Sequence, residues 1–196
     1  AGISAESGIA TFRDAQGLWN NYKIDDVATP RGWLADKKKV LEFYNERRKE
    51  VSKAEPNLAH LGLVDLEEDY DVYIITQNID DLHERAGSTN VLHLHGEIMK
   101  SRSTRNPEIV LDCPGDINIG DKCPDGSQLR PFVVWFGESV PLISDAENII
   151  SECDYVVVIG TTLQVFPAAG LMSCAPSKAI TFIIDPSIPE IKESLT

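Results

Sequence analysis

The sequence predicts an α/β fold built on a parallel, doubly wound sheet with helices on both faces. Short apolar, β-branched runs recur along the chain, as expected for strands buried on both sides. Segments with helical spacing of apolar residues separate them. Strands that alternate with helices pair in parallel, because each helix returns the chain to the same end of the sheet. With 196 residues, the chain has room for one domain or for a domain with a smaller module.

The composition is acidic and otherwise ordinary for a globular protein. The chain has 31 acidic and 18 basic residues, which gives a formal net charge of −13. This charge argues against nucleic-acid binding, which requires a basic surface, and favours basic partners such as lysine-bearing segments. No apolar run approaches the roughly 20 residues that span a bilayer. We therefore expect a cytoplasmic protein without membrane contact, and the sequence leaves its oligomeric state unknown.

The first nine residues are mostly small or hydroxyl-bearing between Gly2 and Gly8. Few Cβ branches stand in this stretch, so its backbone N–H groups can approach an anion closely. In dinucleotide-binding folds, a turn of this kind follows the first strand and opens a helix. A surface loop of glycine and serine is the alternative for this stretch taken alone.

Helices and strands alternate along the rest of the chain. A charged helix without internal Gly or Pro is predicted for residues 35–54, and a second helix from residue 56 has leucines on one face. Residues 100–128 are rich in Pro and Gly, which predicts an irregular excursion from the core. The apolar runs that predict strands are residues 72–76, 91–95, 132–136, 155–159 and 180–184.

Polar residues follow four of the predicted strands. Parallel sheets bind ligands at the carboxyl ends of their strands, so these segments are candidates for one site. Each is also compatible with an ordinary turn, since Asn and Asp are common turn formers. The four segments are Gln77–Asp80, His95–Glu97, Gly160–Leu163 and Asp185–Ser187.

The four cysteines show no paired C-x-x-C spacing. Cys153 and Cys174 lie among apolar residues, so we expect buried thiols there. Cys113 and Cys123 lie in a polar stretch and could supply half of a zinc site. A structural zinc site needs four ligands, and no nearby His or Cys supplies the other two. We therefore expect neither a disulfide framework nor a bound metal.

Five blocks of residues, in order along nearly the whole chain, resemble the signature motifs of the sirtuins, which are NAD-dependent protein-lysine deacylases. The resemblance implies a Rossmann-like NAD-binding domain formed by residues 1–15, 70–99 and 130–196. It also implies a smaller helical and irregular module inserted as residues 16–69 and 100–129. The blocks are Ala1-Gly2-Ile3-Ser4 with Gly8-Ile9 and Phe12-Arg13, Thr76-Gln77-Asn78-Ile79-Asp80, Leu94-His95-Gly96, Phe136-Gly137-Glu138 and Gly160-Thr161-Thr162-Leu163.

The resemblance also implies roles for individual residues. His95 matches the catalytic histidine, and an imidazole with a pKa of about 6.5 suits proton removal near neutral pH. Asn78 and Asp80 would fix the departing nicotinamide carboxamide. His93 shares the strand face of His95 but lacks the adjoining glycine, so we expect it to be structural. Contacts to NAD are implied for Ala1, Gly2, Ile3, Phe12, Arg13, Gln77, Asn78, Ile79, Asp80, His95, Gly160, Thr161, Thr162 and Asp185.

Two residues bear on the acyl group. Tyr44 and Arg47 lie three apart on the predicted helix, so they share a face. An arginine fork matches a carboxylate, and a tyrosine hydroxyl adds a donor. The pair resembles the sirtuin subgroup that removes succinyl and malonyl groups, and the small residue Ala15 fits that subgroup. A solvated basic helix face is the alternative. The family commonly carries two C-x-x-C pairs, so this chain resembles a variant without zinc.

The expected reaction removes acetyl, and also succinyl or malonyl, groups from lysine, with release of nicotinamide and O-acyl-ADP-ribose. Peptide substrates of the family add a strand, which a segment containing Val133, Trp135, Phe136, Gly137 and Glu138 would accept. A buried core strand is the alternative for that segment. A mono-ADP-ribosyltransferase and a non-catalytic NAD or ADP-ribose sensor stay open as other functions.

Overall fold

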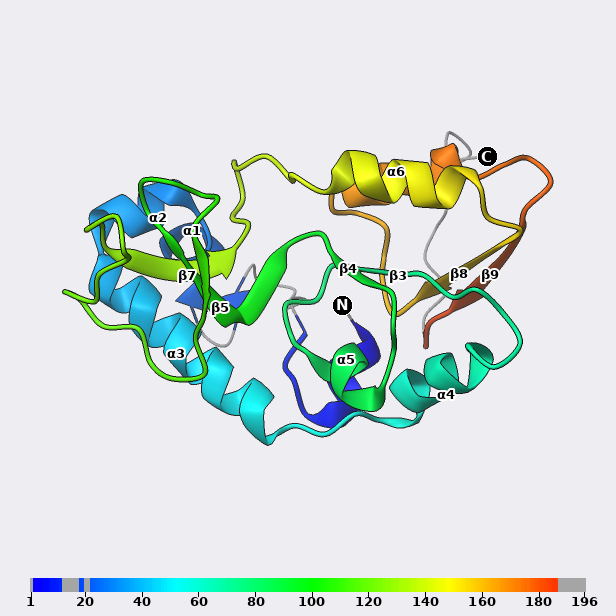
Figure 1. Cartoon of the computed structure of the whole chain (residues 1–196), viewed down its shortest axis with the longest axis horizontal. Coiled ribbons are helices and arrows are strands. Elements are labelled where there is room, and N and C mark those ends of the chain that lie inside the picture. The colour runs from blue at the N-terminus through cyan, green and yellow to red at the C-terminus, as the bar shows by residue number, and fades with distance from the viewer. Residues whose placement is uncertain (1, 12–17, 20–21, 187–196) are drawn as a thin grey trace.

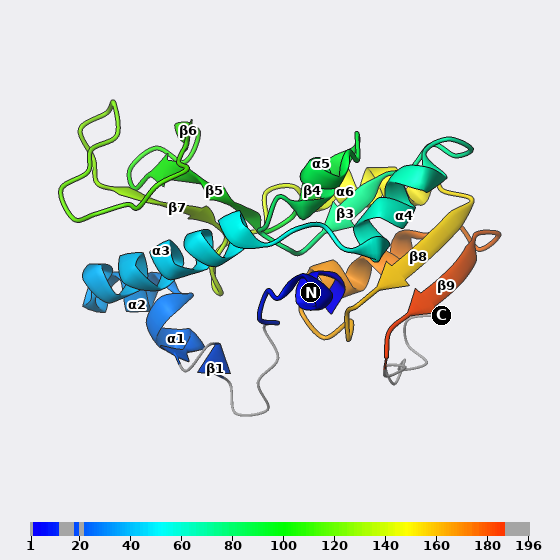
Figure 2. The ribbon, with the colours of Figure 1, turned by 90° about the horizontal axis from the view of Figure 1, so that it is seen from below.

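The computed structural model describes residues 2–11, 18–19 and 22–186, and their elements gather around two hydrophobic cores (Figure 1). Parallel strands between helices form one part, called the parallel half below. Helices packed on an antiparallel sheet form the other, called the antiparallel half (Figures 1 and 2). The predicted α/β class is confirmed.

The parallel half contains two pairs of parallel strands. Strand β3 (Ile74–Thr76) pairs with β4 (Val91–His93), and β8 (Tyr155–Ile159) pairs with β9 (Ile180–Ile184). Helix α6 lies on one side of these strands and α4 on the other (Figure 1). The helical elements of this half are α4 (Leu58–Leu66), α5 (Leu82–Ala86), α6 (Ile143–Ser151) and the 3-10 helix η2 (Ala168–Cys174).

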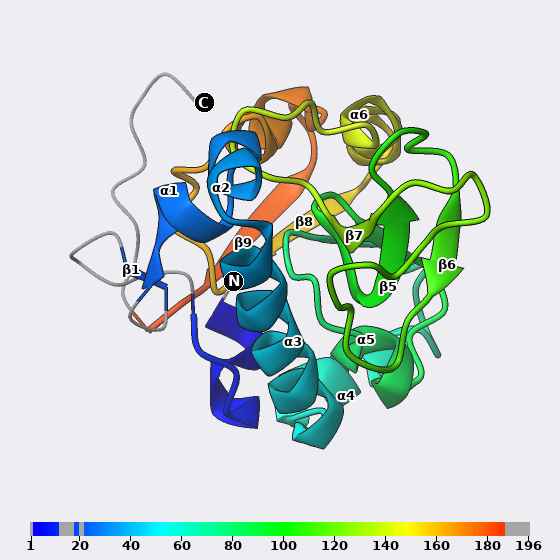
Figure 3. The same ribbon diagram turned by 90° about the vertical axis from the view of Figure 1, so that its left-hand side faces the viewer.

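The antiparallel half packs helices on a three-stranded sheet of order β6-β5-β7 (Figure 3). Its core includes the fully buried Phe43 and Tyr44 of α3, which lie beside Trp33 and Trp135. The elements are β1 (Leu18–Trp19), β2 (Tyr22–Lys23), α1 (Ile24–Val27), α2 (Pro30–Ala35), α3 (Lys37–Lys53), β5 (Gly96–Ser103), β6 (Val110–Asp112) and β7 (Leu129–Val133).

Helix α3 is held to the sheet by buried polar groups as well as by apolar packing. The Asp36 carboxylate caps its first turn by accepting a hydrogen bond from Lys39 N at 3.0 Å. The Arg48 side chain, 1% exposed, donates from Nε to Ile98 O at 2.9 Å. Asn45 Nδ2 donates to the carbonyl oxygen of residue 117 at 2.9 Å. These contacts stabilise the antiparallel half across elements far apart in the sequence.

Two sequence-based predictions about this half were wrong. Residues 100–128 are not irregular throughout, because β5 and β6 pair there in antiparallel fashion. Residues 132–136 do not form a parallel strand, because β7 ends at Val133 and pairs antiparallel with β5. Composition explains the first error: the buried residues Ser101 and Ser103 are polar, and Arg102 between them pairs with Glu138, so no apolar run marks this end of the strand.

The 3-10 helix η1 (Gly2–Ser7) lies between the two halves (Figure 2). Nearby, the chain passes from β4 into β5 at Gly96, which has a positive φ of 82°. A Cβ there would lie 2.2 Å from the carbonyl oxygen of Phe132, so only glycine fits. In the described part of the chain, no helix is long and apolar enough to cross a membrane.

Candidate functional site

Two glycine turns meet in direct contact near the strand ends of the parallel half. Gly2 N donates to Gly160 O at 2.5 Å. Gly160 has a φ of 61°, and a Cβ placed on it would lie 2.6 Å from Ile3 N. The two turns therefore form a cradle that side chains cannot occupy. The N–H groups of Gly2 and Gly160 are already paired, so the feature that fits a ligand is the absence of side chains, which lets a bulky anion such as the diphosphate of a dinucleotide approach the backbone closely.

Polar residues from separate strands come together around this cradle. Gln77 Nε2, after β3, lies 3.5 Å from Thr161 Oγ1, after β8. Gly160 N donates to Ile184 O at 2.9 Å, which brings Asp185 to the same turn. Thr162 follows in that turn and is partly buried. The predicted convergence of the strand ends is therefore present for these segments.

The loop after β3 is anchored at successive residues. Asn78 is 5% exposed, and its backbone N–H donates to Thr76 Oγ1 at 3.0 Å. Its side-chain amide donates to Ser4 Oγ at 2.8 Å. Ile79 O accepts from Ile98 N at 2.7 Å, and the buried Asp80 accepts from Leu82 N. The loop is thus tied to η1, to β5 and to the start of α5.

His95 is oriented as a proton acceptor. Its Nδ1 lies 3.2 Å from Gln77 O, a carbonyl that can only accept, so Nδ1 carries the proton. The lone pair is then on Nε2. Burial lowers the pKa of His95 below its usual value of 6.5, and the bond to Gln77 opposes this only in part. A neutral imidazole with a lone pair on Nε2 can serve as a general base near pH 7.

Three contacts between the start of α4 and η1 were not predicted. They are made by the N-cap Asn57 and by His60. Asn57, the N-cap of α4, accepts from Ala59 N and donates through Nδ2 to Ile3 O at 2.8 Å and to Ser7 Oγ at 3.0 Å. His60 accepts from Asn57 N through Nδ1 and lies with Nε2 3.5 Å from Ser4 Oγ. An Asn before a helix, with a polar residue three positions later, is a capping-box pattern that could have indicated this contact.

The buried face of α4 is therefore not the one that the leucine spacing suggests. Leu58 is 84% exposed, Leu61 43% and Leu66 44%, whereas His60 is fully buried. A polar contact to η1 takes the place of the expected apolar one, which the spacing of the leucines could not reveal.

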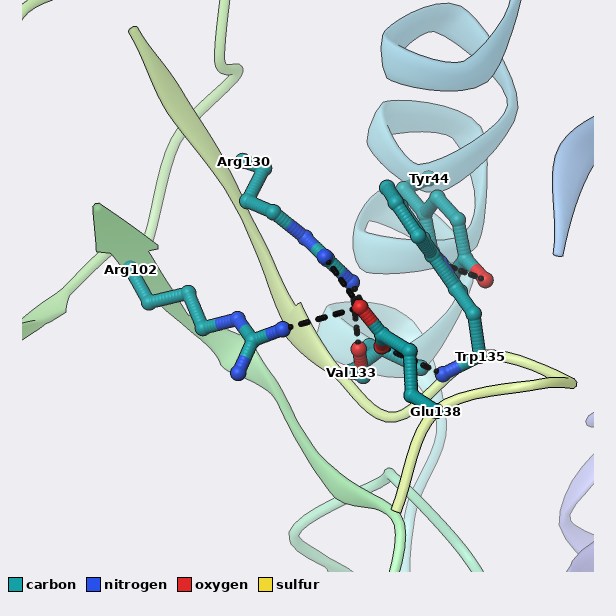
Figure 4. A network of polar contacts seen from close by, with 6 residues as sticks. All are labelled: Tyr44, Arg102, Arg130, Val133, Trp135 and Glu138. Carbon is teal, nitrogen blue, oxygen red and sulfur yellow. Dashed lines mark hydrogen bonds and ion pairs between the residues drawn. The ribbon is translucent and has the colours of Figure 1, made fainter. Parts of the chain in front are cut away.

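Tyr44 and Arg47 lie side by side on α3, as their spacing predicts. Tyr44 is fully buried, and its hydroxyl accepts from Trp135 Nε1 at 3.0 Å (Figure 4). The Arg47 side chain is only 7% exposed and is paired with Glu50. The segment around Trp135 also reaches the histidine, since the backbone N–H of residue 134 donates to His95 O at 2.9 Å. The Tyr44 face of α3 is thereby connected to His95.

Glu138 points inward to a network of two arginines (Figure 4). Arg130 meets its carboxylate with two donors, at 2.7 and 3.1 Å, and Arg102 adds a third at 3.1 Å. Trp135 N donates to the same carboxylate at 2.9 Å, and the Arg130 guanidinium lies 3.2 Å from the Trp135 ring centroid. Peptide contact by Glu138 stays a prediction. The network itself fixes the turn at Gly137, which has a φ of 89°.

Of the remaining predicted site residues, two are described by the structure and four are not. Val133 is buried in the antiparallel half, and Phe136 is 44% exposed. Ala1, Phe12, Arg13 and Ala15 lie outside the described residues.

The four cysteines are free thiols. Cys123 is buried, whereas Cys153 and Cys174 are only partly buried, so the prediction of two buried thiols at those positions was wrong. Cys153 lies in the turn between α6 and β8 and Cys174 ends η2, and both pack only at the margin of the core. Among residues 2–11, 18–19 and 22–186, no three His, Cys, Asp or Glu side chains gather as a metal site.

Comparison with known proteins identifies the family. The model of the Sir2 family matches residues 1–167. The chain belongs to the Sir2 family. It is 55% identical over 187 residues to an NAD-dependent protein deacylase of Aggregatibacter actinomycetemcomitans, covering 95% of this chain and 90% of that protein. A deacylase of the same name from Helicobacter pylori is 53% identical over 186 residues, covering 95% of this chain and 81% of the relative.

Solved Sir2 structures have the same fold. A Sir2 homologue in complex with NAD superposes with a TM-score of 0.88 at 40% identity, covering 97% of this chain and 77% of that one. A Sir2 protein with a deacetylated p53 peptide and 3′-O-acetyl-ADP-ribose superposes with a TM-score of 0.82 at 31% identity, covering 97% and 81%. This Sir2 chain is an NAD-dependent protein deacylase.

Proposed function

We propose that this NAD-dependent protein deacylase removes succinyl and malonyl groups, as well as acetyl groups, from lysine side chains of proteins. The observation that carries the acyl preference is the nearly buried Arg47 beside the buried Tyr44. Bound NAD supplies a ribose carbon that becomes electrophilic as nicotinamide leaves. The chain's own groups hold the reactants, exclude water and accept a proton.

We assign the handling of nicotinamide to the loop after β3. Asn78 and Asp80 are 5% and 4% exposed, and both are fixed by hydrogen bonds to neighbouring elements. An amide and a carboxylate provide a donor and acceptors for a carboxamide. Their anchoring supports a pre-organised site, which lowers the cost of orienting the leaving group.

His95 is the proposed general base. Its Nδ1 donates to Gln77 O, so its Nε2 is available to take a proton from a ribose hydroxyl. Because burial lowers the pKa of His95 below 6.5, the residue is neutral at pH 7.

The proposed acyl preference depends on the positive charge of Arg47 and on the contacts that link Tyr44 to the segment beside His95. The guanidinium of Arg47 is a planar fork of the kind that matches a carboxylate, as its pairing through Nη2 with the Glu50 carboxylate illustrates. Tyr44 is joined through Trp135 to the segment that bonds the His95 carbonyl. A dicarboxyl acyl chain that enters beside His95 would thus end near a buried cation, where a carboxylate is stabilised more strongly than in water.

The test compares Arg47→Met and Arg47→Lys with the parent protein, on acetyl- and succinyl-lysine peptides of the same sequence. Loss of a charged hydrogen-bond partner predicts a decrease of about 10- to 100-fold in kcat/KM for the succinyl peptide. Deacetylation should change by less than about threefold, since that acyl group brings no charge to Arg47. Arg47→Lys should retain only part of the parent's kcat/KM for the succinyl peptide, because lysine lacks the planar fork of donors.

Arg31→Met is the matched control, because Arg31 is an exposed, ion-paired arginine in the same half. It should leave both substrates unaffected. If Arg47→Met lowered deacetylation and desuccinylation equally, Arg47 would have a structural role, and the acyl preference would be refuted while the deacylase activity stood.

The antiparallel half is proposed to be stable without zinc. Cys113 donates its thiol to Gly115 O at 3.4 Å, and Cys123 is buried in the same region. The buried polar contacts of Arg48 and Asn45 tie this region to α3 instead. Metal analysis of the purified protein should find far less than one zinc per chain, and stoichiometric zinc would refute the proposal.

A further inference from the structure

His93, two residues before His95, is buried between two hydrogen-bond acceptors. It is 7% exposed at the end of β4. Its Nδ1 lies 3.0 Å from the backbone carbonyl oxygen of Asn78, and its Nε2 lies 2.7 Å from Glu84 Oε1. A carbonyl has no proton to give, and an ionised carboxylate has none either. Both ring nitrogens therefore face acceptors, and both can donate only when His93 is an imidazolium.

The two histidines hold consecutive carbonyls of one loop. His95 Nδ1 contacts Gln77 O, and His93 Nδ1 contacts Asn78 O. The Asn78 carbonyl and its N–H, which donates to Thr76, together fix the peptide planes on both sides of that residue. These planes set the direction of the Asn78 Cα–Cβ bond, and the hydrogen bond from its side-chain amide to Ser4 Oγ fixes the rest of the side chain.

The charged groups around His93 favour its protonated state. Glu84 and the neutral His83 lie on α5, and Glu97 faces it from β5. Burial lowers the pKa of His93, but the hydrogen bonds to Glu84 and Asn78 and the charges of Glu84 and Glu97 outweigh it, so the net pKa is raised above 6.5. The pKa of His83 is lowered to about 4, first by burial and then by His60, so His83 adds no positive charge at neutral pH.

We propose that His93, held as an imidazolium by Glu84, is a positioning residue that sets the Asn78 loop for nicotinamide binding and release. The inference deepens the proposed function and rests on the role given there to Asn78. If His93 served folding alone, its ion pair with Glu84 would be sufficient. Loss of the donor to Asn78 O would then leave nicotinamide binding and release unchanged. Deprotonation of His93 would turn one of its two contacts into a repulsion between acceptors.

A matched pair of substitutions separates the two contacts. In His93→Asn the amide nitrogen takes the place of ring Nδ1, so it can still donate to Asn78 O. In His93→Gln the amide nitrogen takes the place of Nε2, so it can donate to Glu84 and leaves the Asn78 carbonyl without this donor. Both variants remove the imidazolium charge, so the cost in thermal stability should be similar in the two.

Catalysis should distinguish them. We expect His93→Gln to lower kcat/KM for NAD by about tenfold and to weaken inhibition by nicotinamide, because a buried carbonyl loses its partner beside Asn78. His93→Asn should lose less than about threefold. Equal losses in the two variants, or no loss in either, would overturn the proposal. Absence of NAD-dependent deacylation in the parent protein would instead refute the proposed function.

A second readout needs neither NAD nor turnover. Nitrogen-15 NMR of the ligand-free protein in a pH titration should show the two ring nitrogens of His93 losing their shared charge with a midpoint above the usual imidazole value of about 6.5. Glu84→Gln removes the carboxylate charge and should lower the His93 midpoint, with the alkaline limb of kcat/KM moving to lower pH alongside it. A His93 midpoint at or below about 6.5 in the parent protein would overturn the inference.

Discussion

The buried ion pairs of Glu138 give a prediction about stability that can be worked out from the structure. Glu138→Gln removes one charge from a site where the side chains of Glu138 and Arg130 are 20% and 8% exposed. Removing one partner of a buried pair costs about 3 kcal/mol or more, because the other charge stays buried without compensation. For a chain of this length, that cost corresponds to a decrease in Tm of about 6–12 °C.

Thermal unfolding at pH 7 is the assay, with Glu97→Gln as the control. Glu97 is paired with Lys100 on the same sheet, but this pair is about one third exposed, so its loss should cost less than about 1 kcal/mol. The reasoning would be refuted if Glu138→Gln unfolded within about 1 °C of the parent, or if the two variants lost equal stability.

The pH dependence of the same variant provides an independent check. Burial raises the pKa of Glu138, but the hydrogen bond and charge of Arg130 outweigh it, so the net pKa is lowered from 4.5. A lowered folded-state pKa means that the pair stabilises the protein above pH 4.5 and that this stability is lost as the pH falls through the folded pKa. The difference in Tm between parent and variant should therefore narrow below pH 4.5.

Three further predictions concern the site. Asn57→Asp keeps the helix cap but loses the amide that donates to Ile3 O and Ser7 Oγ, so stability should fall by about 1–3 kcal/mol and the Kd for NAD should rise about three- to tenfold. Calorimetry that found the Kd unchanged would count against this prediction. The acid limb of kcat/KM should have its midpoint below pH 6.5, because the pKa of His95 is lowered, and a midpoint above that value would contradict the assignment. Gly160→Ala would place a Cβ 2.6 Å from Ile3 N, so NAD binding should weaken by more than about tenfold in a titration, and retained affinity would show that the cradle is not used.

Much of the site was accessible to sequence reasoning because its residues follow strand ends. Gln77, Gly160 and Asp185 each come directly after an apolar run, and parallel pairing brings those ends to one edge. The same reasoning found the helical pair Tyr44 and Arg47, since residues three apart always share a face.

The rest depends on contacts that no local pattern encodes. The last four residues of β5 alternate charged residues with serine, so they carry no apolar signal. The buried Ser103 hydroxyl is instead hydrogen-bonded to Asp125 and Ser127. His93 was expected to be structural, and only its two acceptor partners show that it contacts the Asn78 loop on one side and Glu84 on the other. The hydrogen-bond partners of such buried side chains are set by tertiary packing and cannot be read from the spacing of residues along the sequence.

The most direct test follows all products when the protein is incubated with NAD and with acetyl- and succinyl-lysine peptides of the same sequence. Mass spectrometry should show one nicotinamide and one O-acyl-ADP-ribose for each acyl group lost, with the succinyl peptide turned over at least as well as the acetyl one. ADP-ribose left on protein would indicate a transferase, and nicotinamide release independent of peptide would also contradict the account. Turnover of the acetyl peptide alone would contradict the acyl preference assigned to Arg47.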